Sequence, residues 1–211
     1  MKGATTFVIT ADRRGSRRGP DLVPATLTRL QSVRPKPLRA FDRTAGDEIQ
    51  GVAQEPLTVV DVVVTLMRSD DWRLGIGIGP VNRPLPRQAR AGRGPAFIAA
   101  RHAVRSAHST PAQLGVAQSP PDAAADNAES ALWLLCFVMR TRTDSGWEVT
   151  DLLTQGHTQQ EIAHRLGISP SAVSQRVRRS GWAEQLRAQS LATHHLSMAD
   201  GRTGSSGIPE E

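Results

Sequence analysis

Four polar side chains are spaced along one short stretch so that they would share one face of a helix. They are Ser171, Ser174, Gln175 and Arg178, at the three- and four-residue intervals of a helix face. The sequence from 170 to 182 contains no aspartate or glutamate. In a major groove, glutamine can bond adenine, and arginine guanine, through two parallel hydrogen bonds. The stretch therefore predicts a helix that contacts the bases of double-stranded DNA through these four residues.

Neighbouring residues have the chemistry of phosphate contacts. Guanidinium groups, hydroxyl groups and side-chain amides bind phosphate oxygens and set the register of a protein on a duplex without reading its sequence. The residues that complete the predicted DNA-binding set are Arg176, Arg179, Thr158, Gln160 and Ser169.

Start and stop signals place these side chains on two short helices joined by a tight turn. Thr158 followed by Glu161 is a capping box, which predicts the start of a helix. Gly167 can adopt the positive φ at which that helix ends, and Ser169 before Pro170 predicts the start of the next one. This pattern is typical of a helix-turn-helix. The alternative is an ordinary helical hairpin without a ligand.

The predicted helix-turn-helix extends from about Trp147 to Trp182. Val149, Leu152 and Leu153 predict a preceding helix that completes a trihelical core. Because one such unit contacts few base pairs, we expect a homodimer on a two-fold DNA site.

The amino-terminal part alternates between strand-like and helix-like segments in the order β-α-β-β-α-β. Runs of β-branched residues and turn signals predict the strands, and apolar residues at helical spacing predict the helices. This order predicts an α+β fold, in which a ferredoxin-like (βαββαβ) palm domain precedes a small all-α helix-turn-helix domain. Strands are expected at 5–10, 38–44, 48–54, 72–78 and 113–118, and helices at 22–30, 56–67, 96–107 and 127–140.

Two aspartates are expected at one edge of adjacent strands of this palm. Asp12 follows the first strand, and Asp47 lies at the tip of the hairpin. Two carboxylates so placed can hold Mg²⁺ for a nucleoside triphosphate, so both are candidate metal ligands. Alternatively, Asp47 with Gly46 simply makes a favourable turn, and Asp12 caps or pairs with an arginine of the loop 13–18. The sequence leaves both interpretations open.

Three phrases of the sequence resemble the SatD-like family of bacterial proteins, and the resemblance covers nearly the whole chain. More distantly, the phrases are similar to class III nucleotidyl cyclases and diguanylate cyclase domains, which share a ferredoxin-like palm. The phrases are Thr-Ala-Asp-Arg-Arg-Gly-Ser at 10–16, Phe-Asp-Arg-Thr-Ala-Gly-Asp-Glu-Ile-Gln-Gly at 41–51 and Leu-Gly-Ile-Gly-Ile-Gly-Pro at 74–80.

The more distant resemblance implies roles for matching positions only. Asp12 and Asp47 fall where cyclases place their metal-binding aspartates. Arg101 matches an arginine of class III cyclases, whereas Phe97 stands where those enzymes have an asparagine that orients the ribose. We therefore do not expect ordinary cyclase activity.

Charge and composition limit the class of partner. The 26 basic and 20 acidic residues give a formal net charge of +6, which favours a polyanionic partner. No segment reaches the roughly 18 apolar residues that span a bilayer, so we expect a cytoplasmic protein without a membrane partner. The single cysteine, Cys136, cannot form a disulfide within one chain and is expected to be a buried hydrophobe.

Together these patterns predict a transcriptional regulator that binds double-stranded DNA, with an amino-terminal domain that senses a nucleotide or mediates dimerisation. The alternative is a Mg²⁺-dependent nucleotide-binding enzyme or pseudoenzyme related to nucleotidyl cyclases. The expected divisions are a palm domain at 1–120, a connecting helix at 121–145, the helix-turn-helix domain at 146–190 and a disordered tail at 191–211.

Overall fold

A mixed β-sheet forms the centre of the protein, whose computed structural model describes residues 5–15 and 19–201. Within these ranges the sheet has five strands in the order β2-β3-β1-β4-β5. Neighbouring strands pair antiparallel, except that β4 and β5 run parallel. The strands are β1 (Thr6–Arg13), β2 (Arg39–Arg43), β3 (Glu48–Ala53), β4 (Trp72–Gly79) and β5 (Leu114–Gln118).

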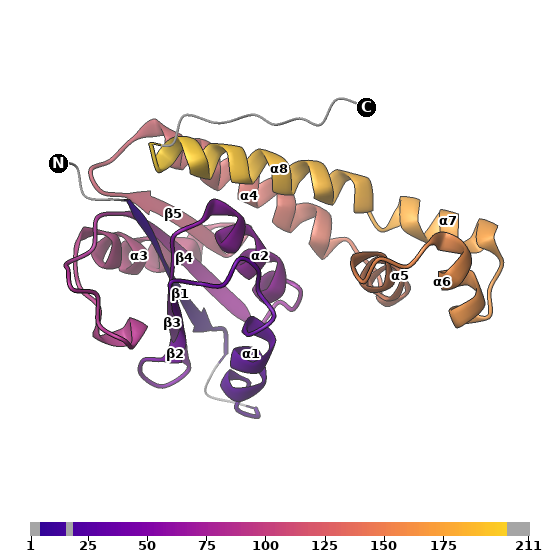
Figure 1. The fold of residues 1–211 in the computed structure, drawn as a ribbon, viewed down its shortest axis with the longest axis horizontal. Helices are drawn as coiled ribbons and strands as arrows, with labels where there is room; N and C mark the ends of the chain where they lie inside the picture. Colours follow the sequence, from indigo (N-terminus) through magenta and orange to yellow (C-terminus); the bar gives the residue numbers. More distant parts are fainter. Residues whose placement is uncertain (1–4, 16–18, 202–211) are drawn as a thin grey trace.

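Helices cover both faces of this sheet, because alternate strand residues supply an apolar surface to each face. From β1, Phe7 and Ile9 join the larger core beneath α1, α2 and α4. Val8 points the other way and packs with Phe97 and Ala100 of α3. Figure 1 shows these layers. The helices are α1 (Val23–Leu30), α2 (Pro56–Met67), α3 (Pro95–Ser106), α4 (Ala123–Arg140) and α8 (Trp182–Ala199), with short 3₁₀ helices η1 (Ala89–Ala91) and η2 (Ala107–Ser109).

The glycines of β4 let α3 lie directly on the strand backbone. A Cβ atom on Gly77 would stand 2.1 Å from the carbonyl oxygen of Ala96 and 2.3 Å from the amide nitrogen of Ala100. A Cβ atom on Gly75 would stand 2.2 Å from the amide nitrogen of Val104. Real Cβ atoms do not approach backbone atoms so closely. These two glycines are therefore required by helix packing.

The predicted α+β class is confirmed. The five predicted strands form, the last of them beyond the β-α-β-β-α-β order. The hairpin between β2 and β3 turns at Gly46, which has a φ of 56°. The strand expected at 113–118 forms as β5 and extends the sheet beside β4. Helix α4, expected as a connection, covers this edge: the indole Nε1 of Trp133 donates to the carbonyl oxygen of Leu114 at 2.9 Å.

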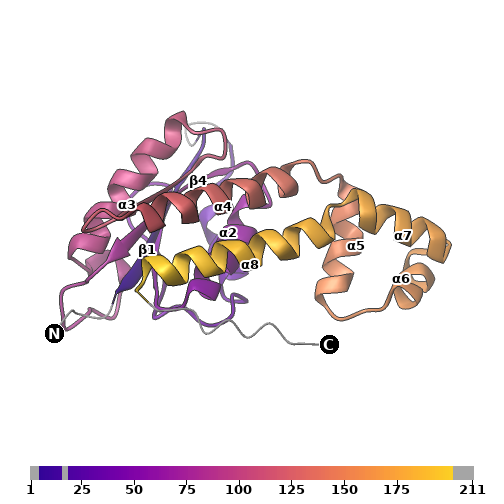
Figure 2. The same cartoon turned by 90° about the horizontal axis from the view of Figure 1, so that it is seen from above.

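Helix α8 is the main departure from the sequence prediction. A disordered tail was expected from residue 191, but α8 continues to Ala199 and lies alongside α4, as Figure 2 shows. Ala192 and Leu196 are fully buried in this contact. Small alanines dominate the buried side of α8, so the sequence lacks the large apolar residues at helical spacing that predict a packed helix. The rest of the expected tail, residues 202–211, lies outside the described residues.

Two further expectations concern Cys136 and the membrane. Cys136 is fully buried on α4, and burial raises the pKa of its thiol to about 12. The side chain therefore packs as a hydrophobe, as expected. In the described part of the chain, no helix combines the length and the apolar character needed to cross a bilayer.

Candidate nucleic-acid interface

Three short helices form a compact group beyond the carboxyl end of α4, away from the sheet (Figure 1). We call this group the trihelical unit. Four buried residues on its three helices make a small core of its own, to which Leu152, Leu153, Leu166, Ile168 and Val177 are added as partly buried neighbours. The buried residues are Val149, Ile162, Ala163 and Val173. The helices are α5 (Asp144–Thr154), α6 (Gln159–Leu166) and α7 (Pro170–Arg179).

Helix α6 begins at the predicted capping box. The Thr158 hydroxyl accepts a hydrogen bond from the amide of Glu161 at 3.3 Å. In return, the Glu161 carboxylate accepts one from the amide of Thr158 at 2.7 Å. This hydrogen bond, more than any other contact, lowers the pKa of Glu161. The cap fixes where α6 starts, and hence its position relative to α7.

The turn between α6 and α7 also follows the sequence signals. Gly167 ends α6 with φ 62° and ψ 32°, a left-handed conformation that favours glycine. The Ser169 hydroxyl then accepts from the amide of Ala172 at 3.2 Å, and Pro170 occupies the first turn of α7. Two helices therefore cross within a three-residue connection.

Helix α7 presents the four candidate base contacts on its outward side. Val173 is buried and faces the core of the trihelical unit. Ser171, Gln175 and Arg178 are exposed, and Ser174 is half-buried at the margin of the same face. The fold thus brings together the residues that the spacing had grouped.

The candidate phosphate contacts differ in what they already bind. Arg179 on α7 and Gln160 on α6 are exposed. The Arg176 guanidinium pairs with the Glu148 carboxylate of α5 at 2.9 Å. The hydroxyl groups of Thr158 and Ser169 are the helix caps described above. Arg179 and Gln160 are therefore the candidates best placed to reach a phosphate without breaking a contact.

Thr158→Ala tests whether its hydroxyl supports α6. Because the amide of Glu161 would lose its hydrogen-bond acceptor, we expect the variant to lose about 1 kcal/mol of stability. Thermal unfolding followed by circular dichroism should show a midpoint lower by roughly 2 to 4 °C. The control is Thr154→Ala, at the end of α5, where no helix start depends on the hydroxyl. Equal midpoints for the two variants would contradict a capping role for Thr158.

The two candidate metal ligands each face an arginine. The Asp12 carboxylate lies 3.5 Å from a guanidinium nitrogen of Arg73, and that of Asp47 lies 4.0 Å from one of Arg13. Asp12 and Arg13 are consecutive strand residues, so their side chains point to opposite faces of the sheet. Asp47 therefore lies near a side chain that leaves β1 on the face opposite to that of Asp12. Asp12 thus lies near an arginine of β4 and not one of the loop 13–18, and Asp47 lies near Arg13 next to its turn.

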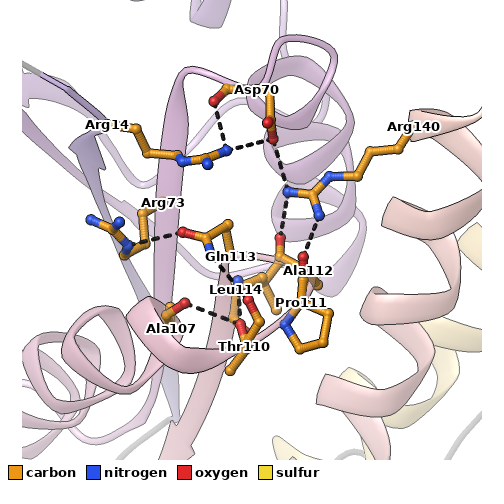
Figure 3. Close-up of polar contacts among 10 residues, drawn as sticks. All are labelled: Arg14, Asp70, Arg73, Ala107, Thr110, Pro111, Ala112, Gln113, Leu114 and Arg140. Atoms are coloured by element: carbon orange, nitrogen blue, oxygen red, sulfur yellow. Dashed lines mark hydrogen bonds and ion pairs between the residues drawn. The ribbon is translucent and has the colours of Figure 1, made fainter.

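Asp12 belongs to a polar region at the end of β1 that Figure 3 shows in part. Arg73, which pairs with Asp12, also donates to the side-chain oxygen of Gln113 at 3.2 Å. Beside it, the Asp70 carboxylate accepts from Arg14 at 2.7 Å and from Arg140 at 3.0 Å. Arginine therefore satisfies both carboxylates in this region. Residues 16–18 of the basic loop lie outside the described residues.

No group of three or more histidine, cysteine, aspartate or glutamate residues that could hold a metal ion occurs in residues 5–15 and 19–201. The two α3 positions matched to cyclases, Phe97 and Arg101, differ in how exposed they are. Phe97 is 3% exposed within the core, whereas Arg101 is exposed on α3.

The family of the chain follows from a comparison of its whole sequence. The family model of the SatD family matches residues 23–196. The chain belongs to the SatD family. The SatD match runs from the start of α1 nearly to the end of α8, so it includes both the sheet and the trihelical unit. Asp47 lies within the SatD match and Asp12 precedes it.

Other comparisons add little to the SatD assignment. No curated protein is similar enough to the chain to count as a relative. Among solved structures, the chain is similar to the crystal structure of a regulator of polyketide synthase expression from Bifidobacterium adolescentis. The two share 17% sequence identity and a TM-score of 0.28, over 97% of this chain and 88% of that one. A TM-score this low says nothing about a shared function.

Two residues of this region were not predicted from the sequence. Glu148 places an acid beside the basic end of α7 and holds Arg176. Arg142 is buried where α4 meets the trihelical unit, and its Nε donates to the carbonyl oxygen of Ser180 at 2.8 Å. Neither has a local signal, because each acts on a residue about 30 to 40 positions away. Only the tertiary fold brings these partners together.

Proposed function

We propose that the chain is a transcriptional regulator that binds double-stranded DNA in a sequence-specific manner, with α6 and α7 as a helix-turn-helix. The observation that carries this proposal is the outward face of α7, where Ser171, Gln175 and Arg178 are exposed together and no acid lies on the helix. A short, polar and positive helix face is what entry into a major groove requires. Helix α6, held by its cap, would cross the DNA backbone.

In this proposal the residues have separate roles. Gln175 and Arg178, with Ser171 and Ser174, contact base edges. Arg179 and Gln160 contact phosphates and set the register. Arg176 can join them once DNA phosphate competes with Glu148 for its guanidinium. Thr158 and Ser169 contribute by fixing the starts of the two helices.

The remainder of the chain forms a second part in this proposal. We infer that β1 to β4, with α1 and α2, form a ferredoxin-like palm, since the order β2-β3-β1-β4 with antiparallel pairs fits that topology. The DNA-binding part is placed at 144–180, between the ends of α4 and α8. Helix α8 is grouped with the palm because it packs on α4 and α2.

The alternative is an enzyme or pseudoenzyme that binds a nucleotide with Mg²⁺ at Asp12 and Asp47. The arginine partners of both carboxylates favour the DNA-binding proposal over this one. Incubation with Mg²⁺ or Mn²⁺ and each nucleoside triphosphate separates them. Turnover that disappears in Asp12→Asn would support the enzyme, and thermal stabilisation by a nucleotide without turnover would support a sensor.

The direct test of the proposed function is selection of genomic DNA fragments by the purified full chain. We expect a small set of fragments that share a sequence element. Recovery of fragments without any common element would contradict sequence-specific binding.

We expect two copies of the chain on each selected element, because a single trihelical unit contacts too few base pairs for useful specificity. Size-exclusion chromatography with light scattering should give the mass of two chains and one duplex. A complex that contains one chain at saturating protein would contradict the dimer.

A further inference from the structure

The trihelical unit is joined to the rest of the protein at a narrow place. The chain passes between the two parts twice, at 141–143 and at 180–181. Helices α5, α6 and α7 otherwise pack chiefly on one another, around their own small core. Two connections and little packing would leave the unit free to tilt. Its orientation therefore depends on the few side chains that cross this junction.

One buried arginine fills the junction itself. Arg142 is 7% exposed, and its guanidinium donates to Ser180, to the side chain of Gln185 at 2.6 Å and to the hydroxyl of Thr150 at 3.2 Å. It also stacks over the ring of Trp147, 4.4 Å from the ring centroid. Arg142 thus ties together α5, the end of α7 and the first turn of α8.

A second arginine reaches the trihelical unit from the end of α2. Arg68, at the carboxyl end of α2, forms two parallel bonds to the Asp151 carboxylate of α5, both 2.7 Å long. Its guanidinium also stacks over Trp147, with 4.6 Å to the ring centroid. Trp147 in turn packs against the main core of the protein. The indole is thus in contact with two guanidinium groups, Arg142 of the junction and Arg68 of α2.

The geometry of Arg68 makes this contact stronger than an ordinary surface pair. A single exposed ion pair contributes little, and both side chains here are partly exposed. A bidentate arginine pair fixes the relative orientation of two groups, and stacking on an indole adds a further attraction. Lysine offers neither the planar fork nor the stacked plane. The contact is therefore specific to arginine.

The end of α2 is itself anchored to the sheet. Asp70, two residues after Arg68, accepts from Arg14 at the end of β1 and from Arg140 at the end of α4. Arg68 therefore extends from a fixed position.

We propose that Arg68 is a positioning residue: with Asp151 and Trp147 it fixes the orientation of α7 relative to the sheet. The inference rests on the proposed function for its consequence, because a fixed orientation matters when two copies must place two α7 helices on one DNA element. A preset orientation lowers the cost of binding the second half of the element. Binding to one half alone does not depend on it.

The first test measures orientation without DNA. Spin labels at Ile98→Cys on α3 and His164→Cys on α6 lie at exposed positions on either side of the junction. Buried Cys136, with its raised pKa, stays unlabelled. Labelled protein in an excess of unlabelled protein reports distances within one copy. We expect a single narrow distance distribution in the otherwise unchanged chain and a broadened one in Arg68→Ala.

Matched variants make this test specific. Arg68→Lys keeps the charge but loses the fork, so its distribution should be broadened as well. Asp151→Asn removes the partner charge with little change in size and should act in the same way. Arg105→Ala removes an exposed arginine of α3 and should leave the distribution unchanged. An unchanged distribution in both Arg68 variants would overturn the proposal.

The second test uses a selected DNA fragment and the same fragment cut to one half of its element. We expect Arg68→Ala to lose about tenfold in affinity for the whole element and almost nothing for the half. An equal loss on both would overturn the positioning role. If the unchanged chain bound no DNA, the proposed function would fail, and the distance measurement would still decide whether Arg68 holds the junction.

Discussion

Arg178→Ala is expected to weaken binding to a selected DNA element by about 1 to 3 kcal/mol, which is the usual cost of losing a bidentate contact to a base. The guanidinium of Arg178 lies exposed on the outward face of α7, one turn beyond Gln175. The loss should be concentrated on one base pair of the element. Gel-shift or fluorescence titrations with the element and its single-base variants would measure it.

The matched control for this prediction is Arg179→Ala. Arg179 is the next residue of α7 and equally exposed, but it lies at the side of the outward face, where we place a phosphate contact. Its removal should weaken binding to all sequences to a similar extent and reduce the dependence of log K on log salt by about one. If the Arg178→Ala variant still distinguished the element from its single-base variants as well as the unchanged chain does, Arg178 would not have the base-contacting role assigned to it.

Gly77→Ala is expected to destabilise the protein by about 3 kcal/mol, at the upper end of what overpacking costs. The new methyl group would meet backbone atoms of α3 at 2.1 and 2.3 Å, and a backbone cannot rotate away as a side chain can. Strand β4 and α3 would have to separate. For a chain of this size, the thermal midpoint should fall by roughly 6 to 12 °C.

A second glycine supplies the comparison. In β3, a methyl group on Gly51 would meet the ring of Phe41 at 2.6 Å, and Phe41 lies at the margin of the core, 9% exposed. Because that ring can shift, Gly51→Ala should lower the midpoint by less. Equal midpoints for the two variants would show that α3 does not lie on β4 as described.

Most local structure could be predicted from the sequence, because its signals act over a few residues. Thr158 and Glu161, Gly167, and Ser169 with Pro170 each determine a helix end from within one turn. The hairpin at Gly46 is another such signal. The run of β-branched residues at 5–10 likewise predicts a buried strand.

What could not be predicted depends on contacts between distant residues. The packing of α8 along α4 depends on alanines such as Ala192, whose small side chains give a weak periodic signal. The pairing of Arg68 with Asp151 spans 83 positions. The same limit applies to the partners of Asp12 and Asp47: the sequence predicts both residues at one edge of adjacent strands, and only the fold shows the arginines near them, Arg73 and Arg13.

The most direct measurement for the central claim is equilibrium binding of the full chain to double-stranded DNA as the salt concentration is raised from a low value. Phosphate contacts release counterions, so affinity that depends on them is greatest at low salt and falls linearly on a log–log scale. We predict saturable binding at low salt with such a decline, and a selected element that retains its advantage over unrelated duplexes throughout. Failure of the intact chain to bind any duplex at low salt would contradict the account.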